Sequence, residues 1–149
     1  MKIAVDTNVV VSAFISKMGQ PAALLNVALT FAEMEILLSD EILEEFRNVL
    51  LRQEVRERFE YTEDDVSGFI ETLRHAVTIV TPVSGFKVVR EYPDDDIVIN
   101  TAFDGEADYI VSGDRHLRNV KRFKNILIVS PKSMLDVIVR RFGETALGE

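Results

Sequence analysis

Five short, mostly apolar runs recur along the chain, and the segments between them are long enough for helices. The runs are residues 3–5, 35–38, 77–80, 108–112 and 126–129. Short apolar strands are typical of a sheet that is covered on both faces. Strands that alternate with helices favour a mostly parallel sheet with right-handed crossovers. The pattern therefore predicts an α/β fold.

Start signals place several of the helices between these runs. Ser39 is a good N-cap for a helix that reaches about Arg52, and Pro131 fits the first turn of a final helix. A capping box with Asp in the place of the usual Glu begins at Thr62. We expect one domain over residues 1–149, with a helical insert around residues 53–76 and a frayed tail from about residue 143.

Composition excludes several classes of site. The chain has no cysteine and only two histidines, which rules out thiolate ligands and disfavours a His-rich zinc site. No run of about 18 apolar residues could cross a membrane, and we expect a cytoplasmic protein. The net charge of −8 argues against a general nucleic-acid coat but not against a nuclease. Carboxylates that hold divalent cations make the metal-free charge negative.

Acidic residues follow the ends of the predicted strands. Asp6 ends the first strand, Glu44 and Glu45 lie in the helix after the second, a run at residues 94–96 opens a helix, and Asp114 follows the fourth strand. The carboxyl ends of parallel strands meet at one edge, where ligands bind in open α/β sheets. Two carboxylates about 4 Å apart repel by about 4 kcal/mol at an effective dielectric near 20. Such a cluster needs protonation or a hard divalent cation. The alternative is that each acid caps a helix or turn.

Four stretches of the sequence resemble the PIN-domain family. They are IAVDTNVVVS at residues 3–12, LSDEILEEF at 38–46, PDDD at 93–96 and ADYIVSGD at 107–114. The resemblance extends from about residue 2 to residue 136 and is strongest to bacterial and archaeal members that are toxins of toxin–antitoxin pairs. It implies a three-layer α/β/α sandwich with a central parallel sheet of about five strands. It also implies a ribonuclease that depends on Mg²⁺ or Mn²⁺.

The resemblance also implies which acids form the site. Asp6 and Asp114 match the first and last family acids. Glu45 matches better than Glu44, and Asp95, seven residues before Ala102, matches better than Asp96, which is the fallback. Catalytic and metal-binding roles are therefore expected for Asp6, Glu45, Asp95 and Asp114. Asn8 and Ser112 match polar residues that support the acids. Tyr92 stands where many members have an acid, so we expect no ligand there.

The expected chemistry is hydrolysis of RNA by water, with one or two cations. A basic segment directly after Asp114 could hold phosphates, and its members are Arg115, Arg118, Lys121, Arg122 and Lys124. A solvated helix face is the simpler interpretation of that segment. We expect His116 to be a surface residue without a catalytic role.

The resemblance implies further partners and leaves alternatives. A toxin requires a small antitoxin protein, and a homodimer is compatible with the family. One alternative is a PIN fold that binds RNA or a protein with weak or no catalysis. The other is a phosphoryl-transfer α/β domain, which is disfavoured because the Asp6-Thr7-Asn8 start lacks the second acid of an Asp-x-Asp motif.

Overall fold

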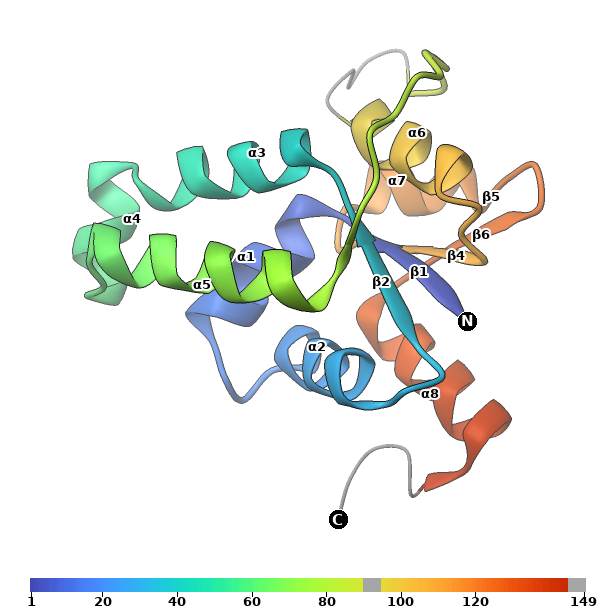
Figure 1. The fold of residues 1–149 in the computed structure, drawn as a ribbon, viewed down its shortest axis with the longest axis horizontal. Coiled ribbons are helices and arrows are strands. Elements are labelled where there is room, and N and C mark those ends of the chain that lie inside the picture. The colour runs from blue at the N-terminus through green and yellow to red at the C-terminus, as the bar shows by residue number, and fades with distance from the viewer. Residues whose placement is uncertain (90–94, 145–149) are drawn as a thin grey trace.

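A computed structural model describes residues 1–89 and 95–144, so the predicted opening of a helix at Tyr92, Pro93 and Asp94 lies outside the described residues. The chain folds as an α/β domain with helices on both faces of a central sheet (Figure 1). The strands are β1 (Lys2–Val5), β2 (Glu35–Leu38), β3 (Thr78–Ile79), β4 (Tyr109–Val111), β5 (Arg122–Phe123) and β6 (Ile126–Val129). The helices are α1 (Thr7–Ile15), α2 (Gln20–Thr30), α3 (Asp40–Leu50), α4 (Gln53–Phe59), α5 (Glu63–Ala76), α6 (Asp96–Asp104), α7 (Arg115–Val120) and α8 (Pro131–Phe142).

The sheet has the strand order β3-β2-β1-β4-β6-β5. The first five of these strands are parallel, as predicted, and β1 lies between β2 and β4. A sixth strand, β5, was not predicted and pairs antiparallel with β6 through only two residues. A segment this short carries no alternation that a sequence pattern could reveal. β1 is buried from Ile3 onward, which agrees with a strand covered on both faces.

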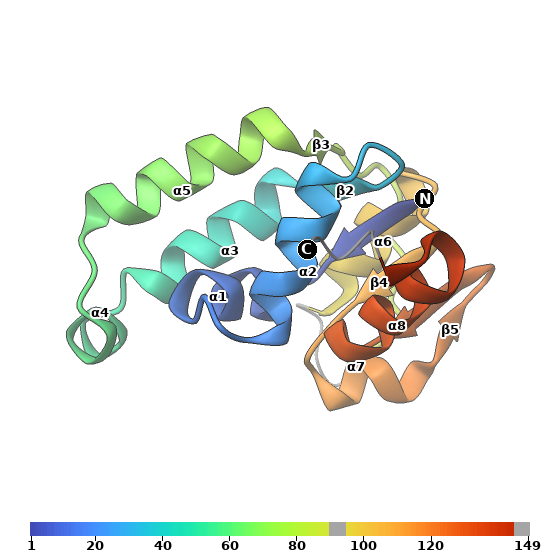
Figure 2. The ribbon, with the colours of Figure 1, turned by 90° about the horizontal axis from the view of Figure 1, so that it is seen from below.

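Helices form one layer on each side of the sheet (Figures 1 and 2). α6 contacts β1, β2 and β4 on one face, while α2 contacts β2 and packs beside α8 on the other. The predicted three-layer α/β/α sandwich is confirmed. None of the helices in residues 1–89 and 95–144 is long and apolar enough to cross a membrane.

Helix ends follow the start signals in the sequence. The Ser39 hydroxyl accepts a bond from the backbone N–H of Ile42, and Thr62 and Asp65 form a reciprocal capping box. α3 ends at Leu50, two residues earlier than predicted, because the next turn leads into α4. Gly143 caps α8, and the end of the predicted frayed tail, residues 145–149, lies outside the described residues.

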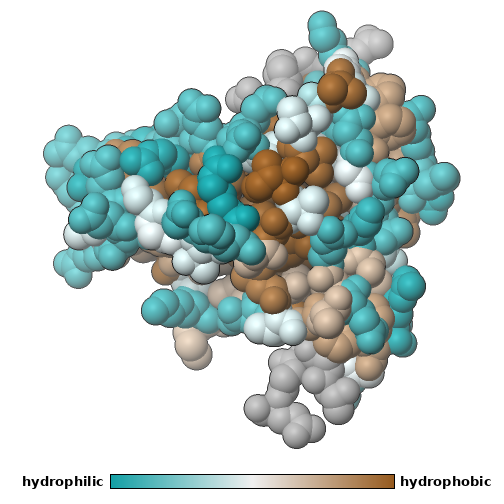
Figure 3. Space-filling model, in the orientation of Figure 1, coloured by the Kyte–Doolittle hydropathy of each residue, from teal (hydrophilic) through white to brown (hydrophobic). Residues whose placement is uncertain are grey.

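α3, α4 and α5 form an arm that projects from the side of the sheet (Figure 1). The arm packs against α1 through aromatic rings. The ring centroid of Phe14 in α1 lies 5.1 Å from that of Tyr61, between α4 and α5, and 5.1 Å from that of Phe69 in α5. The outer surface of the arm is strongly hydrophilic (Figure 3). α3 also contacts α1, which follows β1, and α6, which precedes β4, so the first helix of the arm lies beside helices that begin or end near the sheet.

Candidate active site

Asp6 lies at the carboxyl end of β1, where it is both the end of a strand and the N-cap of α1. Its carboxylate is 7% exposed, and Oδ1 accepts a 2.8 Å bond from the backbone N–H of Thr7. The pKa of Asp6 is raised from 3.8 to about 6, chiefly by burial. Hydrogen bonds from Ser112 and Thr7 lower this pKa, whereas the negative charges of Glu45 and Asp114 raise it. The capping role and the position among other acids therefore coexist in one residue.

Asn8 and Ser112 hold the second oxygen of Asp6. Asp6 Oδ2 accepts bonds from Ser112 Oγ at 2.7 Å and from Asn8 Nδ2 at 3.0 Å. Asn8 Oδ1 in turn accepts a 2.8 Å bond from the backbone N–H of Gly113, and Ser112 Oγ accepts one from the backbone N–H of Asp114. This network joins the ends of β1 and β4 and fixes the Asp6 carboxylate.

Glu45 reaches the same place from α3. Its Oε2 accepts a 3.0 Å bond from the hydroxyl of the buried Thr7, directly after Asp6. Glu44 is exposed, whereas Glu45 is half-buried. The structure therefore brings Glu45 close to Asp6. We call Asp6, Glu45, Asp95 and Asp114, whose charges act on one another, the acidic cluster. Sequence reasoning missed the role of Thr7 as the residue that orients Glu45, although its place within Asp6-Thr7-Asn8 was a signal.

Asp95 precedes α6 and lies among the other three acids. Burial raises the pKa of Asp95 to about 7, together with the charge of Asp114, a hydrogen bond to Asp114, and the charges of Asp6 and Glu45. Its Oδ2 is buried without a hydrogen-bond partner. Burying a carboxylate oxygen without a hydrogen-bond partner costs folding free energy. Among the four acids, Asp95 is the one with such an oxygen.

Asp96, the neighbour of Asp95, faces elsewhere. It is 8% exposed, and its Oδ1 accepts 2.9 Å bonds from the backbone N–H groups of Val88 and Val89. These two bonds tie the carboxylate to the segment before α6. The structure thus places Asp95 beside the other three acids and Asp96 against the backbone of residues 88–89, and the choice of Asp95 as the ligand stays a prediction.

Asp114 is the N-cap of the short helix α7. Its Oδ1 accepts a 2.8 Å bond from the backbone N–H of His116, whose side chain is exposed as expected. The half-buried Asp114 carboxylate acts on both Asp6 and Asp95 through its charge. The four predicted acids therefore come from four separate parts of the chain to one edge of the sheet.

The donor set suits a hard divalent cation. All four side chains offer carboxylate oxygens, which Mg²⁺ and Mn²⁺ prefer, and Asp95 Oδ2 is buried without a hydrogen-bond partner. In the part of the chain that the structure describes, no three His, Asp or Glu side chains already converge as metal ligands. The four carboxylates nevertheless act on one another, since the charges of Glu45 and Asp114 raise the pKa of both Asp6 and Asp95.

The basic segment after Asp114 divides into different environments. Arg115, Lys121 and Arg122 are exposed. Arg118 is half-buried, with its Nε buried and without a hydrogen-bond partner, and its Nη2 lies 3.5 Å from the carbonyl oxygen of Gly113. The ammonium of Lys124 lies over the ring of Phe86 instead. Of the cations in this segment, Arg118 is thus the one in contact with Gly113, directly before Asp114.

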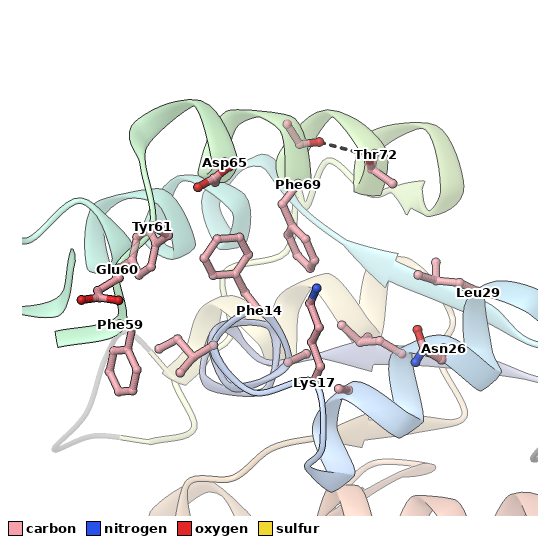
Figure 4. Close-up of a pocket in the computed structure, with 15 residues that line it drawn as sticks. Phe14, Lys17, Asn26, Leu29, Phe59, Glu60, Tyr61, Asp65, Phe69 and Thr72 are labelled. Carbon is pink, nitrogen blue, oxygen red and sulfur yellow. Dashed lines mark hydrogen bonds between the residues drawn. The ribbon is translucent and has the colours of Figure 1, made fainter. Parts of the chain in front are cut away.

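Two cavities lie near these elements. The larger, about 750 Å³, opens between α1, α2 and α5 and is lined mainly by apolar side chains such as Phe14, Leu29 and Phe69 (Figure 4). None of the four acids lines it. The smaller, about 310 Å³, is bordered by Asn8 and Asp114, so it adjoins the acidic cluster. Of the four acids, Asp114 lines this smaller cavity, and the other three do not.

The sequence matches the model of a known protein family. The sequence model of the family described as "PIN domain" matches residues 2–116, a range that includes all four acids. Among curated proteins, no sequence matches the chain.

Proposed function

The chain belongs to the PIN-domain family, which indicates a nuclease-type function, and from this premise we propose that it is a metal-dependent ribonuclease. The observation that carries the proposal is Asp95, a carboxylate with a buried, unpartnered oxygen beside three other acids. Electrostatic strain of this kind clusters at functional sites. Hydrolysis of a phosphodiester is the reaction that a cluster of hard oxygen ligands serves best.

We propose that Asp6, Glu45, Asp95 and Asp114 hold Mg²⁺ or Mn²⁺. When bound, the cation supplies an activated water and compensates the charge that develops on the phosphate. Ser112, Asn8 and Thr7 keep the first two carboxylates in fixed orientations, so that little reorganisation is needed during the reaction.

Arg118 and the exposed cations around it would bind RNA phosphates next to the acids. The guanidinium of Arg118 is a forked donor that suits a phosphate, and its Nη2 lies 3.5 Å from the carbonyl oxygen of Gly113, directly before Asp114. Arg115, Lys121 and Arg122 would contribute a weaker, exposed attraction. These contacts carry no sequence preference by themselves.

An RNA cleavage assay with Mn²⁺, repeated in EDTA, tests the proposal. Replacing any one acid by its amide, as in Asp6→Asn, Glu45→Gln, Asp95→Asn or Asp114→Asn, should reduce cleavage by at least about 100-fold, as losses of catalytic groups commonly do. Glu44→Gln is the matched control, because Glu44 is adjacent to Glu45 but exposed, and it should cleave normally.

Two results would count against the proposal. Cleavage that persists in EDTA and in Asp6→Asn would exclude a metal nuclease. Binding of RNA without cleavage by the wild type would favour the alternative, a PIN fold kept for binding.

The toxin role is a finer proposal that rests on the resemblance. We infer that the protein acts in the cytoplasm as the toxin of a toxin–antitoxin pair, with a small antitoxin protein as partner and with a homodimer as an assembly compatible with the family. Expression of the wild type should arrest growth, whereas Asp6→Asn should not. A short open reading frame directly upstream should encode a protein that relieves the arrest, and failure of that protein to do so would contradict the pairing.

A further inference from the structure

One face of α6 carries three polar side chains at intervals of four residues, namely Asp96, Asn100 and Asp104. Residues four apart lie on the same face of a helix. We call these three residues the α6 clamp. All three bind the backbone of residues 83–89, a segment without regular secondary structure that runs beside α6.

The clamp binds this segment along its whole length. Asn100 bonds both backbone groups of Phe86, with Oδ1 accepting from its N–H at 2.8 Å and Nδ2 donating to its carbonyl at 3.1 Å. Asp104 Oδ2 accepts from the N–H groups of Val83 and Ser84 at 2.7 and 2.8 Å. With the two bonds of Asp96, the clamp satisfies backbone groups that strands would otherwise pair.

Aromatic packing holds the other side of the segment. The ring of Phe86 lies 4.8 Å from that of Phe103 and 5.0 Å from that of Phe123. The ammonium of Lys124 lies 5.3 Å from the Phe86 ring centroid, which is within the range of a cation–π contact. The segment is therefore fixed to both α6 and the β5–β6 hairpin.

The first turn of α6 lacks a conventional N-cap. Asp95 occupies the N-cap position but makes no side-chain capping bond, and its backbone is already helical. In a helix, adjacent side chains point about 100° apart. Because Asp96 is fixed by two amide bonds on one side, Asp95 is directed to the other side, toward Asp114, Asp6 and Glu45.

We propose that the α6 clamp is a positioning device that holds Asp95 in the acidic cluster. The proposal rests on the proposed metal-dependent function for its catalytic consequence, but its structural consequence can be measured without it. Asp96 acts here only as an acceptor, so the clamp requires its oxygen and not its charge. A metal ligand at position 96 would require the charge.

Substitutions at Asp96 distinguish these two roles. In Asp96→Asn, Oδ1 still accepts both backbone bonds, and Mn²⁺ affinity by calorimetry should stay within about threefold of wild type. In Asp96→Ala, both bonds are lost, and Mn²⁺ affinity and kcat should fall about 10- to 100-fold, as outer-shell substitutions typically do. KM for RNA should change little in either variant, since RNA contacts are elsewhere.

A remote member of the clamp tests the same idea without touching the cluster. Asp104→Ala removes the distal bonds and should increase hydrogen–deuterium exchange at least tenfold in residues 83–86 and also in residues 99–102 of α6, where the backbone N–H groups first have partners within the helix. Mn²⁺ affinity should fall in parallel. Asp108→Ala is the control, because the Asp108 carboxylate also accepts a backbone bond, a single one from Lys2 at 2.9 Å, outside the acidic cluster. It should lower stability but leave Mn²⁺ affinity unchanged.

Each remaining outcome has a defined meaning. If Asp96→Asn loses as much Mn²⁺ affinity as Asp96→Ala, Asp96 is a ligand and the positioning role is wrong. If Asp104→Ala increases exchange only in residues 83–86 while residues 99–102 of α6 keep their protection, the clamp does not position Asp95. This exchange result holds whether or not the wild type binds Mn²⁺ or cleaves RNA, and absence of both activities in the wild type would overturn the proposed function alone.

Discussion

The buried charge of Asp6 makes a quantitative prediction for the metal-free protein. The carboxyl has a pKa of about 6 in the folded state and 3.8 as its ordinary value, so the folded state holds its proton more tightly. Between these pH values the folded state binds more protons than the unfolded state, and the free energy of unfolding falls as pH rises. The difference of about two in pKa corresponds to about 3 kcal/mol.

The stabilising contribution of Asp6 is therefore complete below about pH 4 and is lost as pH rises through about 6. For a chain of this length, a loss of about 3 kcal/mol lowers Tm by about 10 °C. Asp95, with a pKa raised to about 7, adds a change of the same sign at slightly higher pH. Asp65 and Asp104 have lowered pKa values, so their contributions are lost only as pH falls below their ordinary value, outside this window.

Urea denaturation in EDTA at intervals from pH 4.5 to 8 measures this dependence. Asp6→Asn is the control, because it keeps a side chain of the same shape without a titrating group, and its slope should be smaller than that of the wild type. Absolute stability is not the readout, since the amide introduced by this substitution would direct an N–H toward the donors Asn8 and Ser112. Excess Mg²⁺ in place of EDTA should also flatten the wild-type slope. A wild-type free energy that rises with pH over this range, or an unchanged slope in Asp6→Asn, would refute the reasoning.

Three further predictions concern parts around the site. Ser39→Ala removes the N-cap of α3 and should destabilise the protein by about 1 kcal/mol in thermal melts; an unchanged Tm would show that water replaces the cap. Gly113→Ala would place a Cβ 3.2 Å from Asn8 Oδ1, so Mn²⁺-dependent cleavage should fall while the far-UV circular dichroism spectrum is retained; normal activity would mean that Asn8 can shift. Arg118→Ala should raise KM for RNA about tenfold and reduce the salt dependence of binding, as loss of a phosphate contact does; Lys121→Ala, with an exposed side chain, should change both less.

Most of the sheet was predictable because its signals are local. β1, β2 and β4 are short apolar runs that are buried along most of their length, and the Ser39 and Thr62 caps depend on residues within one turn. The strand ends then place Asp6 and Asp114 at one edge through topology alone. This much follows from pattern and from the geometry of parallel sheets.

The different surroundings of Asp95, which lies near the other acids, and of Asp96, which binds backbone amides, could not be predicted from local pattern. The difference depends on where the amides of Val88 and Val89 lie, and residues 83–89 have no periodicity that indicates their course. The pairing of Glu45 with Thr7 similarly joins residues that are 38 positions apart. Side-chain bonds to irregular backbone are long-range features that depend on the completed fold.

The helical arm has a consequence for protein engineering. The turn between α4 and α5, around Glu60, divides the chain so that Asp6 and Glu45 precede it and Asp95 and Asp114 follow it. A backbone break there would give two fragments, each with two of the four acids of the acidic cluster, and neither fragment would carry all four. Fused to interacting domains, the fragments would form a conditional enzyme whose activity reports the association of its two halves.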